Sequence, residues 1–146
     1  MNQSLKNIKV AYATMAADLF HRGHLEFIKK AKQYGDFLII GLHPDDVIKK
    51  YKRKAIIPYK DRKAVLASLP WVDKVVADCM DFRRPTMFEN LKKYYVDVMI
   101  HAGEWIPPCY QKASDMGLGG RFIQLKYYPH TSTTQIIQKI QSRKKI

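Results

Sequence analysis

The stretch that decides the fold is IKVAYATMAADLFHRGHLEFIKKAKQYGDFLIIGLH, residues 8–43. Segments 8–13 and 36–43 are short apolar runs containing β-branched residues, a pattern that predicts two strands. Between them, Leu25, Ile28 and Ala31 recur at helical spacing in a segment that ends at Gly35. A helix that connects two strands in this way predicts a parallel pair with a right-handed crossover.

The same alternation continues to the end of the chain. Further strands are predicted at 74–77, 96–102 and 121–127, and further helices at 44–52, 60–69, 86–94, 110–117 and 132–144. Strands that alternate with helices predict an α/β fold, here a Rossmann-like, doubly wound, five-stranded parallel sheet with helices on both faces. No repeat or low-complexity linker interrupts the pattern, so we expect residues 1–146 to form a single domain.

Composition limits the classes of protein that the chain can belong to. Its 146 residues, 47% of them hydrophobic, are enough for one core. No segment approaches the roughly 18 apolar residues of a membrane span, and no apolar signal region begins the chain, so we expect a cytoplasmic protein without membrane insertion. Cys79 and Cys109 are too few for a disulfide framework or a metal cluster.

The chain is strongly basic, with a formal net charge of +13. Such a charge suits nucleic acid, an anionic membrane surface or small phosphorylated substrates. The run KKYKRK at 49–54 is the strongest cluster before the C-terminal tail, and by itself it is equally typical of a solvated helix end. No recognised arrangement of aromatic and basic residues for stacking bases is present, so we expect no nucleic-acid partner.

The sequence His-x-Gly-His at 21–24 follows the first predicted strand. In doubly wound sheets, ligands bind at such strand-to-helix turns. Gly23 leaves room for a ligand to approach the backbone, and the N-terminus of the next helix favours an anion. His21 and His24 can both donate to one phosphoryl group, which predicts a phosphate site. A metal site would need a third ligand such as Asp18, and a structural role for the histidines also stays open.

Four motifs in order carry a family resemblance: ADLFHRGH, DFLIIGLHPDD, YKRKAIIPYKDRKAVLASLPWVDKVV and STTQIIQKI. Together they resemble the cytidylyltransferase branch of the His-x-Gly-His nucleotidyltransferase superfamily over nearly the whole chain. The resemblance implies an enzyme that transfers CMP from CTP to a phosphorylated alcohol or a phosphonate and releases pyrophosphate. It also implies Mg²⁺ bound mainly through the triphosphate, a homodimer, and a place in phospholipid or phosphonate biosynthesis.

The resemblance assigns roles to individual residues. Catalysis falls to His21, His24 and Lys52. The nucleotide is expected to contact Thr14, Met15, Ala16, Asp18, His21, Gly23, His24, Arg62, Ala102, Glu104, Ser132, Thr133 and Thr134, and no residue is expected to bind a metal directly. Without the resemblance, the Ser-Thr-Thr at 132–134 would be interpreted as a helix N-cap.

Three departures from the family pattern concern the base and the acceptor. Residues 15–18 read MAAD where the family commonly has Gly-x-Phe-Asp, and residues 102–105 read AGEW in place of Gly-Asp-Asp-Trp. Residues 127–131 read YYPHT and lack a phosphate-facing arginine. MAADLFHRGH followed by KYKR is most similar to the cytidylyltransferases of phosphonate pathways. An adenylyltransferase of the same superfamily and a catalytically silent nucleotide-binding protein remain alternatives.

Overall fold

A computed structural model describes residues 7–79 and 86–143. In these residues, five strands form one sheet in the order β3-β2-β1-β4-β5, and all neighbouring strands are parallel. The strands are β1 (Val10–Met15), β2 (Phe37–Leu42), β3 (Lys74–Ala77), β4 (Val98–Ala102) and β5 (Arg121–Leu125). β1, which precedes the histidine motif, therefore occupies the centre of the sheet.

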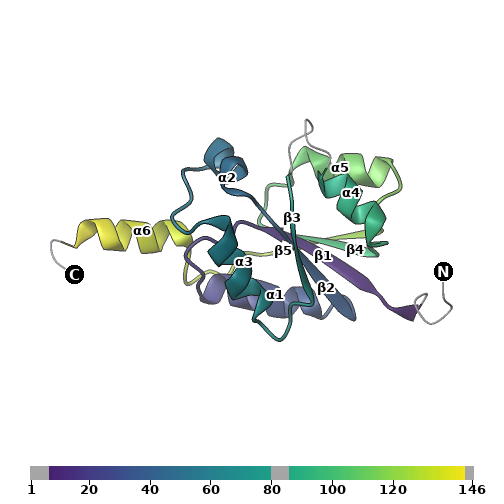
Figure 1. Cartoon of the computed structure of the whole chain (residues 1–146), viewed down its shortest axis with the longest axis horizontal. Coiled ribbons are helices and arrows are strands. Elements are labelled where there is room, and N and C mark those ends of the chain that lie inside the picture. The colour runs from purple at the N-terminus through teal and green to yellow at the C-terminus, as the bar shows by residue number, and fades with distance from the viewer. Residues whose placement is uncertain (1–6, 80–85, 144–146) are drawn as a thin grey trace.

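Helices cover both faces of this sheet (Figure 1). The described part of the chain contains α1 (Arg22–Lys32), α2 (Asp45–Tyr51), α3 (Tyr59–Ala67), α4 (Thr86–Lys93), α5 (Pro108–Asp115) and α6 (Thr133–Ser142). α1 and α3 pack on one face, and α4 and α5 pack on the other. The Rossmann-like, doubly wound fold predicted from the sequence is confirmed.

Alternation along β1 supplies both cores. Ala11 and Ala13 pack with Ile28 of α1 on one face, whereas Tyr12 packs with Leu91 of α4 and with α5 on the other. Successive side chains of a strand point to opposite faces, so the central strand is buried on both sides.

The carboxyl end of β1 lies further along the chain than the sequence pattern indicated. Thr14 pairs with Gly41, and Met15 pairs with Leu42, so β1 continues beyond residue 13. The turn to α1 therefore occupies residues 16–21. The strand predicted at 74–77 is β3, and the other predicted elements are present with shifted ends, as expected for boundaries that depend on capping and pairing.

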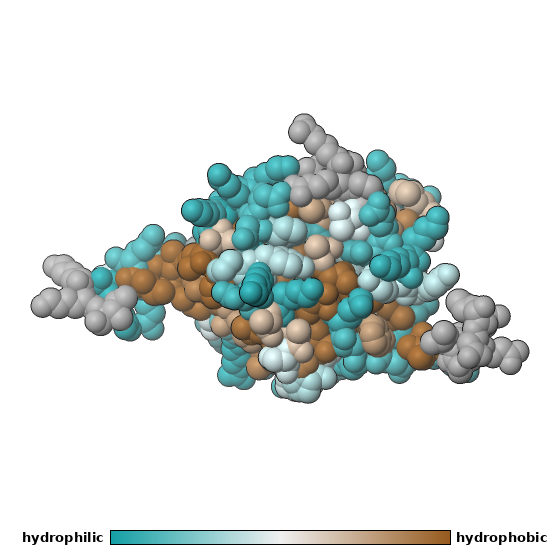
Figure 2. All heavy atoms as spheres, viewed as in Figure 1, coloured by the Kyte–Doolittle hydropathy of each residue, from teal (hydrophilic) through white to brown (hydrophobic). Residues whose placement is uncertain are grey.

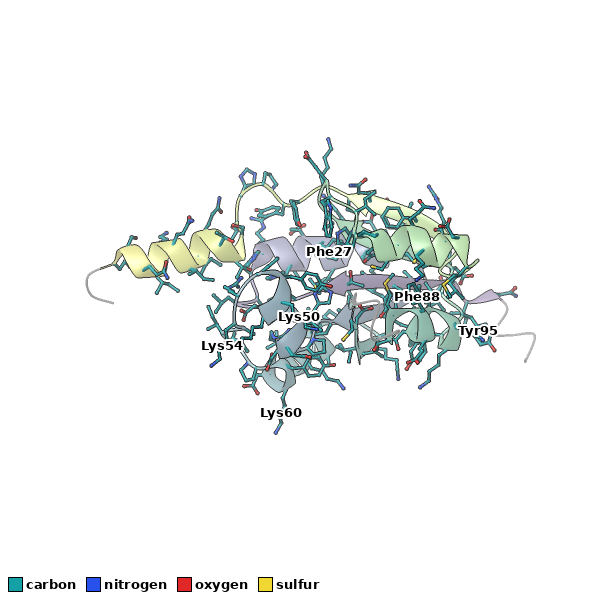
Figure 3. All side chains as sticks on the ribbon, turned by 90° about the horizontal axis from the view of Figure 1, so that it is seen from above. Phe27, Lys50, Lys54, Lys60, Phe88 and Tyr95 are labelled. Atoms are coloured by element: carbon teal, nitrogen blue, oxygen red, sulfur yellow. The ribbon has the colours of Figure 1, made fainter. Side chains whose placement is uncertain are left out.

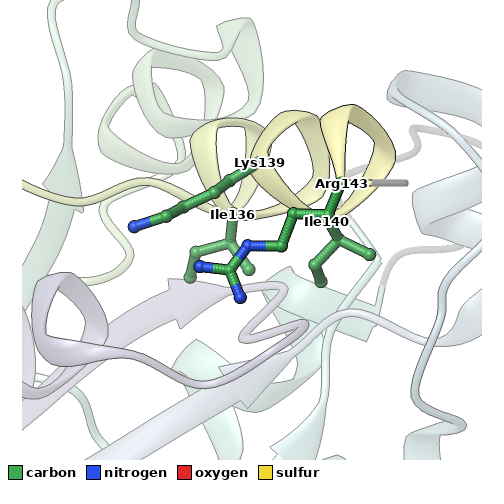
Figure 4. A pocket seen from close by; sticks show the side chains of 4 residues that line it. All are labelled: Ile136, Lys139, Ile140 and Arg143. Carbon is green, nitrogen blue, oxygen red and sulfur yellow. The ribbon is translucent and has the colours of Figure 1, made fainter. Parts of the chain in front are cut away.

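α6 projects from the body of the molecule (Figure 1) and has no buried residue in its described length. Apolar side chains gather on it where it leaves the body (Figure 2). A pocket along this helix is lined by Ile136, Lys139, Ile140 and Arg143 (Figure 4), and it includes none of the predicted site residues. Within the described ranges, no helix is long and apolar enough to cross a membrane.

Candidate functional site

The His-x-Gly-His motif builds the first turn of α1. His21 is the N-cap residue, and its Nδ1 accepts a hydrogen bond from the Gly23 N–H at 2.9 Å. The Nδ1 of His24 accepts from the His21 N–H at 3.1 Å. This reciprocal pattern is a capping box, which is usually formed by Ser or Thr with Glu or Gln. The two imidazoles therefore fix the start of the helix, and their own orientation is fixed with it.

These contacts also determine which nitrogen carries the proton. Because each Nδ1 accepts a hydrogen bond, each neutral ring holds its proton on Nε2. Burial lowers the pKa of His21. Burial, followed by His21 and Lys52, lowers the pKa of His24 to about 3, although Asp18 acts in the opposite direction. The two rings, whose centroids lie 3.9 Å apart, are therefore neutral at pH 7 and present Nε2–H donors.

The start of α6 lies against the start of α1. The Thr133 hydroxyl donates to the Asp18 carbonyl at 3.1 Å and lies 3.2 Å from the Nε2 of His21, from which it accepts. Ser132 is the N-cap of α6, and its Oγ accepts from the Gln135 N–H at 3.1 Å. Two helix N-termini therefore meet at the histidine motif, an arrangement that favours an anion.

Gly23 is required for a different reason from the one expected. A Cβ at this position would lie 2.6 Å from the His21 ring and 3.0 Å from the Thr131 carbonyl oxygen. The place that a side chain would occupy is thus filled by the protein itself, and the contact of Gly23 with the nucleotide stays a prediction. Thr134, in the first turn of α6, is exposed, and its contact with the nucleotide stays a prediction.

Asp18 connects the turn after β1 to the basic segment after α2. Its carboxylate accepts from the Ile56 and Ile57 N–H groups, both at 2.9 Å, and from Arg53 at 3.2 Å. The residues on either side of it, Ala17 and Leu19, have φ values of 52° and 51°, in the left-handed region. The carboxylate is buried and committed to these contacts, so its clearest role in the structure is to hold the segment that follows Lys52.

Lys52, the C-cap residue of α2, lies within electrostatic reach of three histidines. Its charge lowers the pKa of His24, and it has the same effect on His43 and His101. Burial lowers the pKa of the Lys52 ammonium itself, and the charge of Arg53 adds to this shift. The residue as a whole is nevertheless exposed to solvent. The structure therefore brings Lys52 to the histidine motif, and its catalytic role stays a prediction.

Arg62 was expected near the base or the triphosphate, a contact that stays a prediction, and in the structure it is hydrogen-bonded within the protein. Its side chain is fully buried and donates to the carbonyl oxygens of Ala16 and His43 at 2.7 and 2.8 Å. It also donates to the Ile57 carbonyl at 2.9 Å and to the Asp45 carboxylate at 2.6 Å. With its donors committed in this way, the guanidinium joins three segments of chain under the site and does not face an open surface.

The loop after β4 was expected to contact the base. Ala102 ends β4 and is half-buried, and Glu104 is exposed. The Gln124 amide donates to the carbonyl oxygens of Gly103 and Glu104 at 2.6 and 2.9 Å. Gly103 has φ of 100°, and a Cβ there would lie 2.5 Å from the Tyr127 ring. The family's acidic residue cannot occupy this position unless Tyr127 moves.

Thr14 and Met15 at the end of β1, and Ala16 directly after it, contact other parts of the protein. The Thr14 hydroxyl is hydrogen-bonded to the Tyr110 hydroxyl, and Met15 is buried in the core beside α1. The Ala16 carbonyl accepts from Arg62. Their predicted contacts with the nucleotide stay predictions.

A second polar cluster, which the sequence analysis missed, lies deeper on the α4–α5 face. The Tyr12 hydroxyl donates to Asp78, and Asn90 donates to that hydroxyl at 3.0 Å. Burial raises the pKa of Asp78 to about 6, although the Tyr12 bond opposes the shift. These residues come from β1, the end of β3 and α4, so no local pattern in the sequence could have indicated the cluster.

Two further histidines of the site were also missed. His43 directly follows β2, and His101 lies near the end of β4. Each stands at the carboxyl end of a strand beside β1, a position that the predicted sheet could have flagged. Burial, followed by Lys52, lowers the pKa of His43 to about 3, with smaller contributions from His101 and Arg62.

The residues of the site offer hydrogen-bond donors and positive charge, which suit an anion. No group of three or more His, Cys, Asp or Glu in residues 7–79 and 86–143 could hold a metal ion. The site offers Nε2–H donors, a lysine and two helix N-termini.

In α/β proteins with a Rossmann-like sheet, ligands bind at the carboxyl ends of the strands, and the histidine motif of this chain lies at that end of the central strand. The chain belongs to the cytidylyltransferase-like family, whose model matches residues 16–139. The histidine motif and the start of α6 both fall inside the matched region, so the family resemblance predicted from the sequence is confirmed.

Curated relatives match the chain over only part of their own length. The bifunctional protein HldE of Helicobacter hepaticus is 33% identical over 146 residues, which cover 97% of this chain and 28% of that protein. HldE of Helicobacter pylori strain P12 is 29% identical over 144 residues, covering 94% of this chain and 29% of the relative. The chain thus corresponds to one segment of these longer proteins.

Two solved structures share the fold. A lipopolysaccharide core biosynthesis protein from Thermoplasma volcanium has a TM-score of 0.72 at 18% identity, covering 84% of this chain and 99% of that one. Pantoate-beta-alanine ligase from Francisella tularensis, complexed with beta-gamma ATP and beta-alanine, has a TM-score of 0.57 at 16% identity, covering 93% and 70%.

Proposed function

We propose that the protein is a nucleotidyltransferase that transfers a nucleoside monophosphate from a nucleoside triphosphate to a small acceptor bearing a phosphate or phosphonate. The observation that carries this proposal is the pair of neutral imidazoles, His21 and His24, at the junction of two helix N-termini. Donors of this kind stabilise charge that develops on phosphoryl oxygens without forming a covalent bond to them.

The reaction is an in-line displacement. An oxygen of the acceptor forms a bond to the α-phosphorus, and the bond from that phosphorus to the bridging oxygen breaks, so pyrophosphate leaves with the electron pair. His24 donates from Nε2 to an oxygen of the α-phosphate, and Lys52 supplies positive charge beside it. His21 shares its Nε2–H with Thr133, which orients the start of α6 toward the same phosphates. Catalysis then consists of positioning and charge stabilisation.

Mg²⁺ fits this site as an ion that the nucleotide carries. Asp18, the last carboxylate before the motif in the sequence, is committed to backbone N–H groups, which leaves the phosphate oxygens as the ligands. When bound there, Mg²⁺ neutralises triphosphate charge.

Lys52 adds a positive charge beside the same phosphates. Lys52→Ala should therefore raise KM more strongly at low salt than at high salt, because screening weakens the contribution of a charge.

For the nucleotide, the proposal favours ATP, the adenylyl alternative. The pantoate-beta-alanine ligase that shares this fold is complexed with beta-gamma ATP. Gly103 replaces an acidic residue of the cytidylyltransferase pattern, and its carbonyl is already bound by Gln124. CTP is the second candidate, because the family to which the chain belongs is described as cytidylyltransferase-like.

Calorimetric titration with ATP, CTP, UTP and GTP tests the nucleotide. Tighter binding of ATP supports adenylyl transfer, and tighter binding of CTP supports the cytidylyl reaction. A pyrophosphate-release screen of all four nucleotides against phosphoethanolamine, glycerol 3-phosphate and 2-aminoethylphosphonate tests catalysis. Nucleotide binding without pyrophosphate release from any pair would indicate the catalytically silent alternative.

We also propose that the protein forms a homodimer and is located in the cytoplasm. Ile136 and Ile140 line the pocket on α6, and Ile140 is 47% exposed, so this stripe is an apolar surface that a second copy could cover. Sedimentation velocity of the full chain and of Ile140→Asp tests this expectation. A smaller sedimentation coefficient for the variant supports it.

A further inference from the structure

His43 and His101 approach each other across the end of β1. His43 directly follows β2 and His101 lies near the end of β4, the two strands that flank β1 in the sheet. Ile39 and Met99, which precede them at even spacing, both pack on the α4–α5 face, so the two histidines follow on that face. The His101 ring packs against Tyr110 of α5 with centroids 5.0 Å apart. The pair thus lies on the sheet face opposite α1.

Each of these rings has a buried nitrogen without a hydrogen-bond partner among the described residues. The atoms are the Nε2 of His43 and the Nδ1 of His101. Buried polar atoms in folded proteins nearly always have a partner, and an exception calls for an explanation such as a missing ligand. Two exceptions at the carboxyl ends of the two strands that flank β1, at the edge of the sheet where ligands bind, indicate a place for one ligand.

The free nitrogen of His101 is an acceptor. The ring donates to the Trp105 carbonyl, and because Nδ1 has no partner, the donating atom is Nε2. Burial and Lys52 keep the ring neutral by lowering its pKa, although the Trp105 bond acts in the opposite direction. The Nδ1 lone pair of His101 can therefore accept a hydrogen bond from a ligand.

The charged groups near the pair are positive. Lys52 lies within electrostatic reach of both rings, and Arg62 lies within reach of His43, to whose backbone carbonyl its guanidinium is already bonded. Lys52 is therefore the cation that a ligand at this position would contact. A ligand with an anionic group beside Lys52 and a hydrogen-bond donor beside His101 would pair with the lysine charge and with the unpartnered Nδ1 of His101.

We propose that His43, His101 and Lys52 form the acceptor subsite, and that the acceptor carries a hydroxyl or protonated amino group next to its phosphoryl or phosphonyl oxyanion. This inference rests on the nucleotidyl-transfer function proposed above. The oxyanion of the acceptor contacts Lys52, and from this position it can attack the α-phosphate that His24 binds. The hydroxyl or amine of the acceptor donates to the Nδ1 of His101. His43 supplies the second neutral ring nitrogen.

The subsite makes a prediction about substrate choice. Phosphoethanolamine, 2-aminoethylphosphonate and glycerol 3-phosphate each carry an N–H or O–H donor. Phosphocholine carries a fully methylated nitrogen, and propyl phosphate carries no donor at all. A site built to accept a hydrogen bond discriminates against ligands that leave it unpaired, so the wild-type kcat/KM should be at least about 10-fold higher for the first group.

The variants His101→Phe and His43→Phe keep a ring in place and remove its nitrogens. For each, kcat/KM with phosphoethanolamine should fall at least about 10-fold, while that with propyl phosphate stays within about 3-fold of wild type. Nucleotide affinity, measured by calorimetry, should be unchanged. Lys60→Ala is the control, because this basic side chain points away from the body (Figure 3) and should leave all of these values unchanged. Circular dichroism checks that the variants fold.

Binding without turnover separates this inference from the proposed function. Titration of the wild-type chain with phosphoethanolamine and with phosphocholine, each with a non-hydrolysable nucleotide present, should show tighter binding of phosphoethanolamine even where no pyrophosphate is released. Equal affinity for the two, or equal loss of both acceptors in His101→Phe, overturns the subsite. Comparison of 2-aminoethylphosphonate with phosphoethanolamine then tells whether the oxyanion is a phosphonate or a phosphate ester.

Discussion

The Nε2 of His21 lies 3.2 Å from the Oγ1 of Thr133, although 112 positions separate them in the chain. The same Thr133 hydroxyl donates a hydrogen bond to the Asp18 carbonyl at 3.1 Å. Three elements of the site, the turn after β1, the start of α1 and the start of α6, are therefore joined by one side chain.

Thr133→Val should weaken nucleotide binding about 10-fold, because it removes the hydroxyl that joins α6 to this turn and leaves the His21 donor without its partner. Calorimetry with the preferred nucleotide measures the effect. Ser142→Ala is the matched control, since it removes a hydroxyl from the last turn of the same helix, where Ser142 bonds to the Lys139 carbonyl of α6. Equal effects of the two variants would show that the Thr133 bridge has no special role.

His24→Ala should lower kcat by roughly 10²-fold, the loss expected for one preorganised donor to a developing oxyanion. His24→Gln separates chemistry from folding, because glutamine at this position can still cap the helix. We expect this variant to recover the thermal stability of the wild type and not its kcat. Long-range ¹H–¹⁵N spectra should show the wild-type ring in the neutral Nε2–H form from pH 8 down to pH 5, since its pKa is about 3.

Asp18→Asn should loosen the basic segment, because an amide can accept from only one of the two backbone N–H groups that the carboxylate now binds. The expected result is faster trypsin cleavage after Arg53 and Lys54 and a higher KM for the acceptor, with secondary structure retained. Asp36→Asn, which alters a carboxylate at the opposite end of the sheet, is the control. An unchanged cleavage rate in Asp18→Asn would contradict the role in holding this segment.

Gly103→Asp, which restores the acidic residue of the family pattern, should destabilise the fold by about 1–2 kcal/mol, because a side chain at positive φ is strained. The new Cβ also meets the Tyr127 ring. Tyr127→Ala should relieve part of the cost, so the double variant should be more stable than the sum of the single effects predicts. Urea denaturation of the four proteins measures this, and strict additivity would argue against the steric explanation.

Asp78→Asn should change the dependence of stability on pH. The pKa of Asp78 is raised to about 6 in the folded protein, so folding favours the protonated acid. That stabilisation is present below about pH 4 and is lost as the pH rises to about 6. Asparagine does not titrate, so the stability of the variant relative to wild type should increase over this window and then level off. Urea denaturation at several pH values measures it, and a constant difference would contradict the shift.

Much of this architecture can be predicted from the sequence, for a physical reason. Whether a segment forms a strand or a helix depends on the spacing of apolar residues a few positions apart, as in Leu25, Ile28 and Ala31. Helix starts are also local: His21 and His24 cap a helix through atoms that lie within three residues of each other. The doubly wound sheet, the position of the histidine motif at its edge and the family were therefore predictable.

Only the tertiary structure decided what each polar side chain does. Arg62 has the sequence context of a ligand-binding arginine, yet its carbonyl and carboxylate partners come from three other segments and hold it in the interior. His43 and His101 lie at the carboxyl ends of β2 and β4, which are separate in sequence and become neighbours of β1 only when the sheet forms. A change of a few tenths of an ångström in the distance between two such segments decides whether a hydrogen bond forms. The sequence determines that distance only through the packing of the whole chain.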